Sequence, residues 1–289
     1  MKISSISKPQ IPMTNDQVSS KIQNPKQLLK KYEIKPSKRL GQNFLVDELT
    51  LNKIVETADL SSNDTVLEIG SGLGILTLEL AKRVNRVIAV EKDRKLYYIL
   101  REILKDQNIN NVETINGDIL KISNLAYRQA GQIQNSNYKI VANLPYYITS
   151  PVIRKFLENP PADRKPGFMV LMVQKEVAQR ICAEPPKMSL LSIAVQFYAE
   201  PKIISYVSKK YFYPQPKVDS AIIKIIPKEI PKIDTEKFFG LIKRGFSAKR
   251  KMLKNNLSGF DFEKIGLNPK IRAENLTIDN WLKIYEAIQ

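Results

Sequence analysis

The chain has 289 residues, 43% of them hydrophobic, so it can bury a sizeable core and is long enough for one large domain and a small one. Its 46 lysines and arginines exceed its 29 aspartates and glutamates, which gives a formal net charge of +17. This charge implies a polyanion as partner and favours nucleic acid, although a generally basic proteome would produce it without that function.

The residue types that are missing exclude several chemistries. Cys182 is the only cysteine, which rules out a disulfide, a zinc site of paired cysteines and a cysteine-ligated iron–sulfur cluster within one chain. The chain has no histidine, which rules out a histidine general base and histidine-ligated metals. We therefore expect no metal site, and a mechanism that depends on positioning, carboxylates and a bound cofactor.

The N-terminal segment predicts neither secretion nor a membrane anchor. Residues 1–24 are rich in Ser, Gln, Asn, Lys and Pro and are predicted to be a flexible leader. The chain has no run of about eighteen apolar residues, and its N-terminus lacks an apolar signal core. We predict a soluble cytoplasmic protein with no membrane partner, and we expect a monomer.

Alternating short apolar runs and amphipathic stretches follow the leader. Residues 47–58 have helical spacing, and Asp47 could cap their start. Beyond them the pattern predicts strands at 65–69, 87–91, 112–115, 138–142 and 168–173, and helices at 75–82, 93–105 and 151–157. Strands that alternate with helices predict an α/β fold, a doubly wound, parallel, Rossmann-like sheet that binds ligands at the carboxyl ends of its strands. We place this domain at residues 25–226.

The C-terminal part has a different pattern. Residues 218–226 read as a closing strand, and Pro227 and Pro231 bracket a linker. Helical periodicity at 235–246, 248–257 and 277–288 then predicts a small all-α C-terminal domain over residues 232–289. Its basic residues are either a phosphate-binding face or a solvated helix surface, and we favour RNA contact. They are Lys243, Arg244, Lys249, Arg250, Lys251 and Lys254.

A glycine-rich loop, Gly-Ser-Gly-Leu-Gly at residues 70–74, lies between a predicted strand and a helix. Glycines there allow a tight turn and let a ligand lie against the main chain. A dinucleotide-binding fingerprint would require glycine at position 75, where Ile75 stands. Glu68, the acidic residue before the first glycine, is instead characteristic of loops that bind S-adenosylmethionine.

Two carboxylates follow at the ends of the next two predicted strands. Glu91 lies about twenty residues after the loop, where a carboxylate can accept both hydroxyl hydrogens of an adenosine ribose. Asp118 could receive the amino group of the cofactor adenine. Either acid alone could equally be a helix cap or a turn residue. Their placement at successive strand ends favours a cofactor site.

The segment Asn143-Leu144-Pro145-Tyr146 follows the fourth strand and contains the groups needed to hold a planar amine. An exocyclic amine on an aromatic ring is a poor nucleophile because its lone pair is delocalised, so a catalyst must hold it in line with an electrophile. The Asn143 side-chain oxygen and a backbone carbonyl can accept its N–H groups, and Tyr146 can stack on the ring. A strand followed by a proline turn with tyrosines in the core is the alternative.

With these motifs the chain resembles the small-subunit ribosomal RNA adenine dimethyltransferases, from about residue 35 to the C-terminus. The resemblance implies methyl transfer from S-adenosylmethionine to N6 of two adjacent adenosines near the 3′ end of small-subunit ribosomal RNA. It also implies a pre-ribosomal particle as the partner and a role in small-subunit biogenesis. It further rests on residues 40–45 (LGQNFL), 174–177 (QKEV), 212–220 (FYPQPKVDS) and 250–257 (RKMLKNNL).

The same resemblance assigns roles to individual residues. Asn43 and Leu45 would contact the cofactor, Gly70 its methionine part, Glu91 its ribose and Asp118 its adenine. The full implied cofactor set is Asn43, Leu45, Glu68, Gly70, Gly72, Glu91, Asp118 and Asn143. Asn143 would lie between cofactor and target, and Tyr146 and Phe212 would sandwich an adenine that is flipped out of its stack. The full implied catalytic set is Asn143, Leu144, Pro145, Tyr146 and Phe212.

Three other functions compete with this one. A large-subunit RNA adenine methyltransferase of the antibiotic-resistance type would share the chemistry, but we expect Ile where Leu144 stands. A non-catalytic RNA-binding factor could keep the fold, but the intact Gly70, Glu91 and Asn143 argue against lost catalysis. A nicotinamide dehydrogenase is disfavoured by the glycine spacing and by the basic charge.

Overall fold

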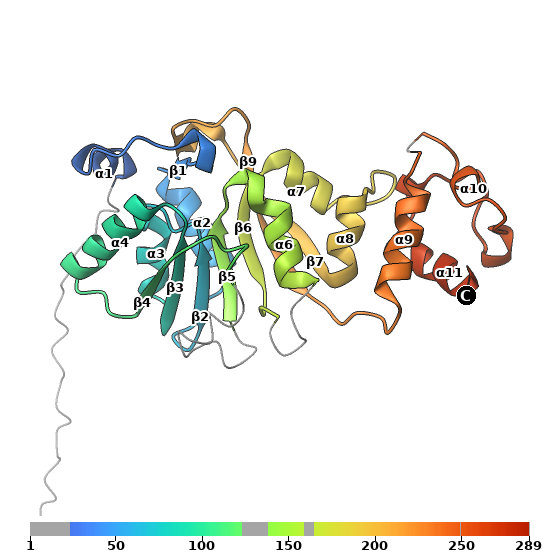
Figure 1. The fold of residues 1–289 in the computed structure, drawn as a ribbon, viewed down its shortest axis with the longest axis horizontal. Coiled ribbons are helices and arrows are strands. Elements are labelled where there is room, and N and C mark those ends of the chain that lie inside the picture. Colours follow the sequence, from blue (N-terminus) through green and yellow to red (C-terminus); the bar gives the residue numbers. More distant parts are fainter. Residues whose placement is uncertain (1–23, 123–137, 159–164, 249, 289) are drawn as a thin grey trace, which may run out of the picture.

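The computed structural model describes residues 24–122, 138–158, 165–248 and 250–288 (Figure 1), so residues 1–23 of the predicted leader lie outside it. Seven of the described strands form one sheet in the order β4-β3-β2-β5-β6-β9-β7, and β1 pairs with β8 in a separate ribbon. The strands are β1 (Phe44–Leu45), β2 (Thr65–Ile69), β3 (Arg86–Glu91), β4 (Val112–Asn116), β5 (Tyr138–Asn143), β6 (Met169–Gln174), β7 (Ala199–Val207), β8 (Phe212–Tyr213) and β9 (Ser220–Pro227). The helices are α1 (Pro25–Lys31), α2 (Glu48–Thr57), α3 (Ile75–Ala81), α4 (Arg94–Asp106), α6 (Thr149–Leu157), α7 (Lys175–Ile181), α8 (Leu190–Tyr198), α9 (Thr235–Gly245), α10 (Leu253–Asn256) and α11 (Ile278–Ile288). None of these described helices is long and apolar enough to cross a membrane.

The topology of the sheet agrees with the predicted doubly wound fold, with one difference. Strands β2 to β6 run parallel to one another, but β9 is antiparallel to both β6 and β7. The chain between β7 and β9 returns at the same edge of the sheet instead of crossing a face, so these two strands must be antiparallel. Strand β7 has no clear sequence signal because it carries Pro201 and a register shift between Ile203 and Ser205.

Two hydrophobic cores cover the two faces of the sheet. Val66 of β2 belongs to the core beneath α2, α3 and α4, whereas Leu67 and Ile69 belong to the core beneath α6, α7 and α8. Because both faces are buried, the central strands read as continuous apolar runs. Full burial of one such side chain stabilises the fold by about 1.5–3 kcal/mol relative to exposure. The carboxyl ends of β2 to β5 consequently meet along one rigid edge.

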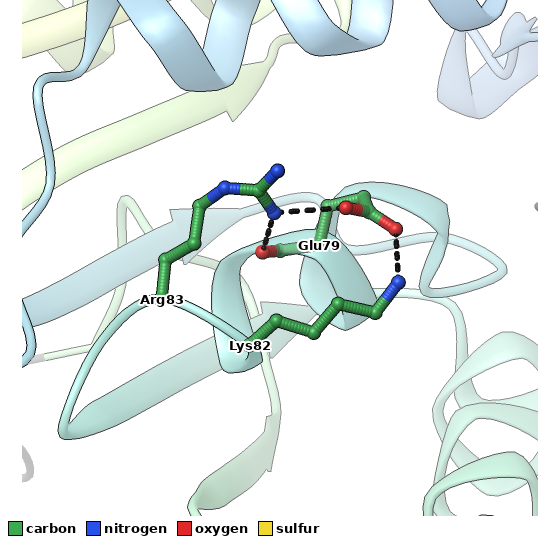
Figure 2. Close-up of polar contacts among 3 residues, drawn as sticks. All are labelled: Glu79, Lys82 and Arg83. Atoms are coloured by element: carbon green, nitrogen blue, oxygen red, sulfur yellow. Dashed lines mark hydrogen bonds and ion pairs between the residues drawn. The ribbon is translucent and has the colours of Figure 1, made fainter. Parts of the chain in front are cut away.

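A nearly buried carboxylate anchors the C-terminal end of α3 (Figure 2). Glu79 is 8% exposed and accepts hydrogen bonds from Lys82 Nζ at 2.5 Å and from Arg83 Nη1 at 2.8 Å. The same arginine nitrogen donates to the Glu79 carbonyl at 2.8 Å. Burial raises the pKa of Glu79, but the two cations together hold that pKa below its ordinary value. The cluster therefore fixes the end of α3 that is opposite to the glycine-rich loop.

The C-terminal helices pack on α8 through aromatic side chains. Phe238 of α9 has its ring centroid 5.0 Å from that of Phe197 in α8 and 5.6 Å from that of Tyr285 in α11. Trp281 of α11 is fully buried. These side chains belong to the same cluster as one face of the sheet. The helical segment and the sheet therefore share a continuous core.

The helix predicted at residues 248–257 is wrong in extent, since only α10 is helical in the described part of that stretch. The Leu253 N–H donates to the Ile271 carbonyl at 2.7 Å. Asn256 Nδ2 donates to the Gly245 carbonyl at 2.6 Å. These longer-range bonds and the burial of Leu253 replace the early helical turns that local periodicity predicts.

Candidate active site

The glycine-rich loop joins β2 to α3 in a conformation that requires glycine. Gly70, Gly72 and Gly74 have φ angles of 76°, 58° and 81°, in the left-handed region. At Gly74 a Cβ atom would lie 2.5 Å from Leu100 Cδ1, so a larger residue would force the Leu100 side chain of α4 to move. The Gly70 N–H donates to the Val90 carbonyl at 2.8 Å, which fixes the loop against the end of β3.

Glu91 ends β3 and binds the loop directly. Its Oε2 accepts a hydrogen bond from the Gly72 N–H at 2.8 Å, and its Oε1 accepts one from the Asp93 N–H at 2.7 Å. The side chain is 7% exposed, and burial raises its pKa while the two N–H groups oppose that shift. Each carboxylate oxygen keeps a second lone pair, so the group can still accept hydroxyl hydrogens from a ligand.

Glu68 lines the same site, but its carboxylate bonds to the protein. Thr77 Oγ1 of α3 donates to Glu68 Oε2 at 2.5 Å. The glutamate is 2% exposed, and burial raises the pKa of its carboxyl group to about 8. This bond links β2 to α3, the two elements that the glycine-rich loop joins, so Glu68 helps to hold the loop in place.

Asp118 lies after β4 and forms an ion pair at the rim. Its Oδ2 is 2.9 Å from Lys92 Nζ, and its Oδ1 accepts a hydrogen bond from the Leu120 N–H at 3.0 Å. Burial raises the pKa of Asp118, but Lys92, the Leu120 N–H and Lys121 together hold it below its ordinary value. The group is therefore an ionised acceptor at neutral pH, as a partner for an amino group must be.

The end of β5 places the segment 143–146 against the glycine loop. Leu144 is 2% exposed and belongs to the core. Pro145 packs on the loop, because a Cβ atom added to Gly70 would lie 3.5 Å from Pro145 Cδ. Tyr146 shares a hydrogen bond of 2.8 Å between its hydroxyl and Ser220 Oγ. The ring of Tyr146 is thereby held at a fixed position beside Asn143.

A segment near the N-terminus, residues 37–46, lies across this region and is called the N-terminal strap here. Its strand β1 pairs with β8, so that Leu45 lies opposite Phe212 in the ribbon. The Val46 N–H donates to the Tyr211 carbonyl at 2.8 Å. Asn143 Nδ2 donates to the Asn43 carbonyl at 3.3 Å. The strap therefore brings two predicted cofactor residues next to two predicted target residues.

Gln42 attaches the N-terminal strap to the start of α4. Its Nε2 donates to Asp93 Oδ2 at 2.8 Å, and its Oε1 accepts from the Ser37 N–H at 2.7 Å. The next strap residue but one, Phe44, covers the loop, because a Cβ atom on Gly72 would lie 3.3 Å from Phe44 Cε1. These contacts hold the N-terminal strap against the glycine-rich loop and the start of α4.

Every residue that the sequence predicts for the site lines one cleft at the carboxyl ends of β2 to β5. The predicted cofactor residues along it are Asn43, Leu45, Glu68, Gly70, Gly72, Glu91, Asp118 and Asn143. The predicted target residues along it are Leu144, Pro145, Tyr146 and Phe212. The structure thus brings all of them together, and their individual roles stay predictions.

Gln42, Ser71, Lys92 and Tyr147 also line the cleft and are not among the predicted residues. Each of them stands next to a predicted residue in the sequence. This adjacency is the signal by which sequence reasoning could have found them. Ser71 Oγ is buried and has no hydrogen-bond partner within the described part of the chain. An unpartnered buried hydroxyl beside a glycine cradle is a feature that a polar ligand would complete.

The donor set fits S-adenosylmethionine. The glycine loop and Ser71 offer backbone and hydroxyl groups for an amino-acid part, Glu91 offers acceptors for ribose hydroxyls, and Asp118 offers an acceptor for an adenine amine. In the ranges that the structure describes, no group of three or more His, Cys, Asp or Glu side chains could hold a metal ion.

Helices α9, α10 and α11 lie at the far end of the molecule from the strand β1 of the strap (Figure 1). Lys243 and Arg244 in the last turn of α9 are exposed, and so are Lys251 and Lys254. Lys249 lies outside the described residues. Contact of this surface with RNA stays a prediction.

Comparison with known proteins gives consistent results. Residues 34–289 match the family model described as ribosomal RNA adenine dimethylase. A ribosomal RNA small subunit methyltransferase A from Dehalococcoides mccartyi is 42% identical over 287 residues, covering 95% of this chain and 96% of that protein. The protein of that name from Clostridium botulinum is 40% identical over 279 residues, covering 92% of this chain and 98% of that protein.

Two solved structures share the fold over most of the chain. A dimethyladenosine transferase from Plasmodium falciparum gives a TM-score of 0.71 at 28% identity and covers 83% of this chain and 95% of that one. The 23S rRNA methyltransferase ErmE gives a TM-score of 0.70 at 27% identity and covers 86% of this chain and 100% of that one.

Proposed function

The chain belongs to the ribosomal RNA adenine dimethylase family, and from this premise we propose that it methylates N6 of two adjacent adenosines near the 3′ end of small-subunit ribosomal RNA, twice on each base. S-adenosylmethionine is the methyl donor. The observation that carries the proposal is the convergence of the glycine loop, Glu91, Asp118 and Asn143 on one cleft at neighbouring strand ends. This arrangement supplies acceptors for an adenosine-containing cofactor and for a second amine.

The reaction is a displacement at a methyl carbon. S-adenosylmethionine supplies an electrophilic methyl group on a positively charged sulfur, so the N–C bond forms as the C–S bond breaks. Asn143 Nδ2 donates to the Asn43 carbonyl, which leaves Asn143 Oδ1 to accept an N–H of the target amine. The amine lone pair attacks once this hydrogen bond holds it in line, and the proton leaves to solvent after the attack.

The target adenine must leave its stack to reach the cleft, and two aromatic side chains are placed to receive it. Tyr146 is held through its hydroxyl by Ser220, and Phe212 is held by the pairing of β8 with β1. Both rings are thus ordered before a base arrives. Stacking on an aromatic ring contributes about 1–3 kcal/mol per base.

We assign the remaining parts of the function on the same basis. The substrate is ribosomal RNA within a pre-ribosomal particle, and the enzyme acts as a monomer in the cytoplasm during small-subunit biogenesis. Residues 25–226 form the methyltransferase domain, and residues 232–289 form an RNA-docking domain. The net charge of +17 and the exposed basic residues after α9 support the contact with RNA.

The test of this function is the substitution Asn143→Ala. We expect turnover to fall by about two to three orders of magnitude, as when a single oriented hydrogen-bonding group is removed from a transition state. The Kd for S-adenosylhomocysteine should change little, because the loop, Glu91 and Asp118 remain. Single-turnover methylation of unmethylated small subunits, together with equilibrium cofactor titration, measures both quantities.

The exposed amide Asn110 provides the control, and Asn110→Ala should leave both values as in the wild type. Full activity in Asn143→Ala would remove the assigned role. Mass spectrometric mapping of methylated adenines in cells that lack the protein decides between small-subunit and large-subunit RNA. Complete methylation in those cells would favour a non-catalytic factor.

A further inference from the structure

Helix α4 carries an exposed surface of arginines and tyrosines that takes no part in the cleft. We define the α4 Arg–Tyr face as Arg94, Tyr97, Tyr98, Arg101 and Lys105. Both arginines and Lys105 are exposed, and Tyr98 is 51% exposed. Their spacing of three or four positions puts them on one side of the helix, opposite the apolar side that enters the core.

Each arginine of this face is held over a tyrosine ring. Arg94 Cζ lies 5.6 Å from the Tyr98 ring centroid, and Arg101 Cζ lies 5.7 Å from the Tyr97 ring centroid. The two rings meet edge to face with centroids 5.2 Å apart. Arg94 Nη2 also donates to the Tyr98 hydroxyl at 3.4 Å, and Arg101 Nη1 donates to the Tyr97 hydroxyl at 3.5 Å. Each guanidinium has five N–H donors, so the others remain to bind phosphate oxygens.

The positive charge of the α4 Arg–Tyr face is not neutralised by acidic side chains. Within the described ranges, neither Arg94 nor Arg101 forms an ion pair with a carboxylate. Glu102 of the same helix accepts a hydrogen bond at 3.2 Å from Tyr32, which follows α1. The two arginines are therefore available to an external anion.

Helix α4, which carries the α4 Arg–Tyr face, lies at the opposite end of the sheet from the C-terminal helices (Figure 1). Helix α4 packs beside β3 and the edge strand β4. It begins just after Glu91, at the rim of the cleft. The cleft therefore lies between this face and the basic residues that follow α9.

We propose that the α4 Arg–Tyr face binds the sugar–phosphate backbone of ribosomal RNA outside the adenosine that enters the cleft. The identity of this RNA rests on the proposed function. Flat guanidinium groups and exposed tyrosine rings recognise RNA through phosphate contacts and base stacking. The net charge of +17 favours a polyanion of this kind over a protein partner.

The test compares Arg94→Gln/Arg101→Gln with the wild type on small ribosomal subunits purified from cells that lack this protein. Binding should weaken about tenfold at physiological salt, and the slope of log K against log salt should fall by about two, one for each lost phosphate contact. The KM for subunits should rise, while kcat and the Kd for S-adenosylhomocysteine stay unchanged. Unchanged cofactor binding also shows that the variant is folded.

Arg154→Gln is the matched control, because Arg154 is exposed but already pairs with Glu158 at 2.9 Å. It should keep the wild-type slope and KM. A second variant, Arg94→Lys/Arg101→Lys, retains the charge without the flat donor geometry and should fall between the wild type and the glutamine variant.

A double glutamine variant with the wild-type slope and KM would overturn the inference and would direct attention to an acidic protein as the partner of this face. The proposed function fails by a different result. If the wild type bound these subunits but methylated no adenine in them, the proposed methylation would be contradicted. The salt dependence of binding would still test whether the α4 Arg–Tyr face contacts RNA.

Discussion

The pKa of the Glu68 carboxyl group is raised because the residue is buried. Its carboxyl group accepts a hydrogen bond from Thr77, and burial raises its pKa to about 8. A carboxyl group whose pKa is raised on folding stabilises the fold at pH values below its ordinary pKa. That contribution is lost as the pH rises through the folded value, because ionisation then favours the unfolded chain.

The substitution Glu68→Gln should remove this dependence, because glutamine has the shape of the protonated acid and can still accept from Thr77. Between pH 5 and pH 8 we expect the free energy of unfolding of the wild type to fall by about 1.4 kcal/mol or more relative to Glu68→Gln, the value of one pKa unit. Urea denaturation of both proteins without cofactor at the two pH values measures the difference.

Glu79→Gln is the opposite control, because its neighbours hold the pKa of Glu79 below the ordinary value. Its contribution is present above the ordinary carboxyl pKa and is lost as the pH falls through the lower folded value. A constant difference between wild type and Glu68→Gln across the pH range would show that Glu68 is ionised throughout.

At the scale of elements, the N-terminal strap decides how complete the site is before a ligand binds. The strap is held by β1–β8 pairing, by the contact of Phe44 with the loop and by the hydrogen bonds of Gln42. A strap that is ordered in advance lowers the conformational entropy that binding must remove. Gln42 therefore acts on the cofactor through the position of Asn43 and Phe44.

Gln42→Ala should raise the Kd for S-adenosylhomocysteine about threefold to tenfold, the effect of losing the order of one or two side chains. The free energy of unfolding should change by less than about 1 kcal/mol, because Gln42 adds no apolar burial. Calorimetric titration and urea denaturation measure the two quantities. Gln107→Ala, at an exposed glutamine after α4, is the control, and an equal Kd in both variants would show that the strap needs no such attachment.

At the scale of the whole molecule, one core joins the sheet to the C-terminal helices. Phe238 contacts Phe197 of α8 and Tyr285 of α11, and all three belong to the core on one face of the sheet. The cleft lies at the carboxyl ends of β2 to β5 and includes none of these side chains. Stability of the helical segment and cofactor binding should therefore respond separately to substitution.

Phe238→Ala should lower the free energy of unfolding by about 3–5 kcal/mol, the cost of a cavity at a fully buried phenylalanine. The Kd for S-adenosylhomocysteine should stay at the wild-type value. Trp281 is the only tryptophan and is buried in α11, so its fluorescence during denaturation reports on the C-terminal helices. Leu190→Ala, at a side chain that is 46% exposed, is the control. A loss of cofactor affinity in Phe238→Ala would couple the two regions.

The sequence by itself determined the parts of this protein that depend on short-range pattern. Apolar periodicity located β2 to β6. Glu91 and Asn143 end two of those strands and Asp118 follows a third, and they meet because parallel strands all present their carboxyl ends to one edge. The glycine loop was recognisable because its φ angles demand glycine. Family resemblance then connected Asn43 and Phe212 to the same site.

Only the tertiary structure decided how distant segments meet. It reversed β9, shortened the helix predicted at 248–257, paired the N-terminal strap with β8, bonded Glu68 to Thr77 and set Lys92 against Asp118. None of these contacts follows from local spacing, because each depends on the free energy of burying or bonding groups that belong to different elements. The α4 Arg–Tyr face likewise became visible only when the helix packed its apolar side and left its arginines without carboxylates in the described structure.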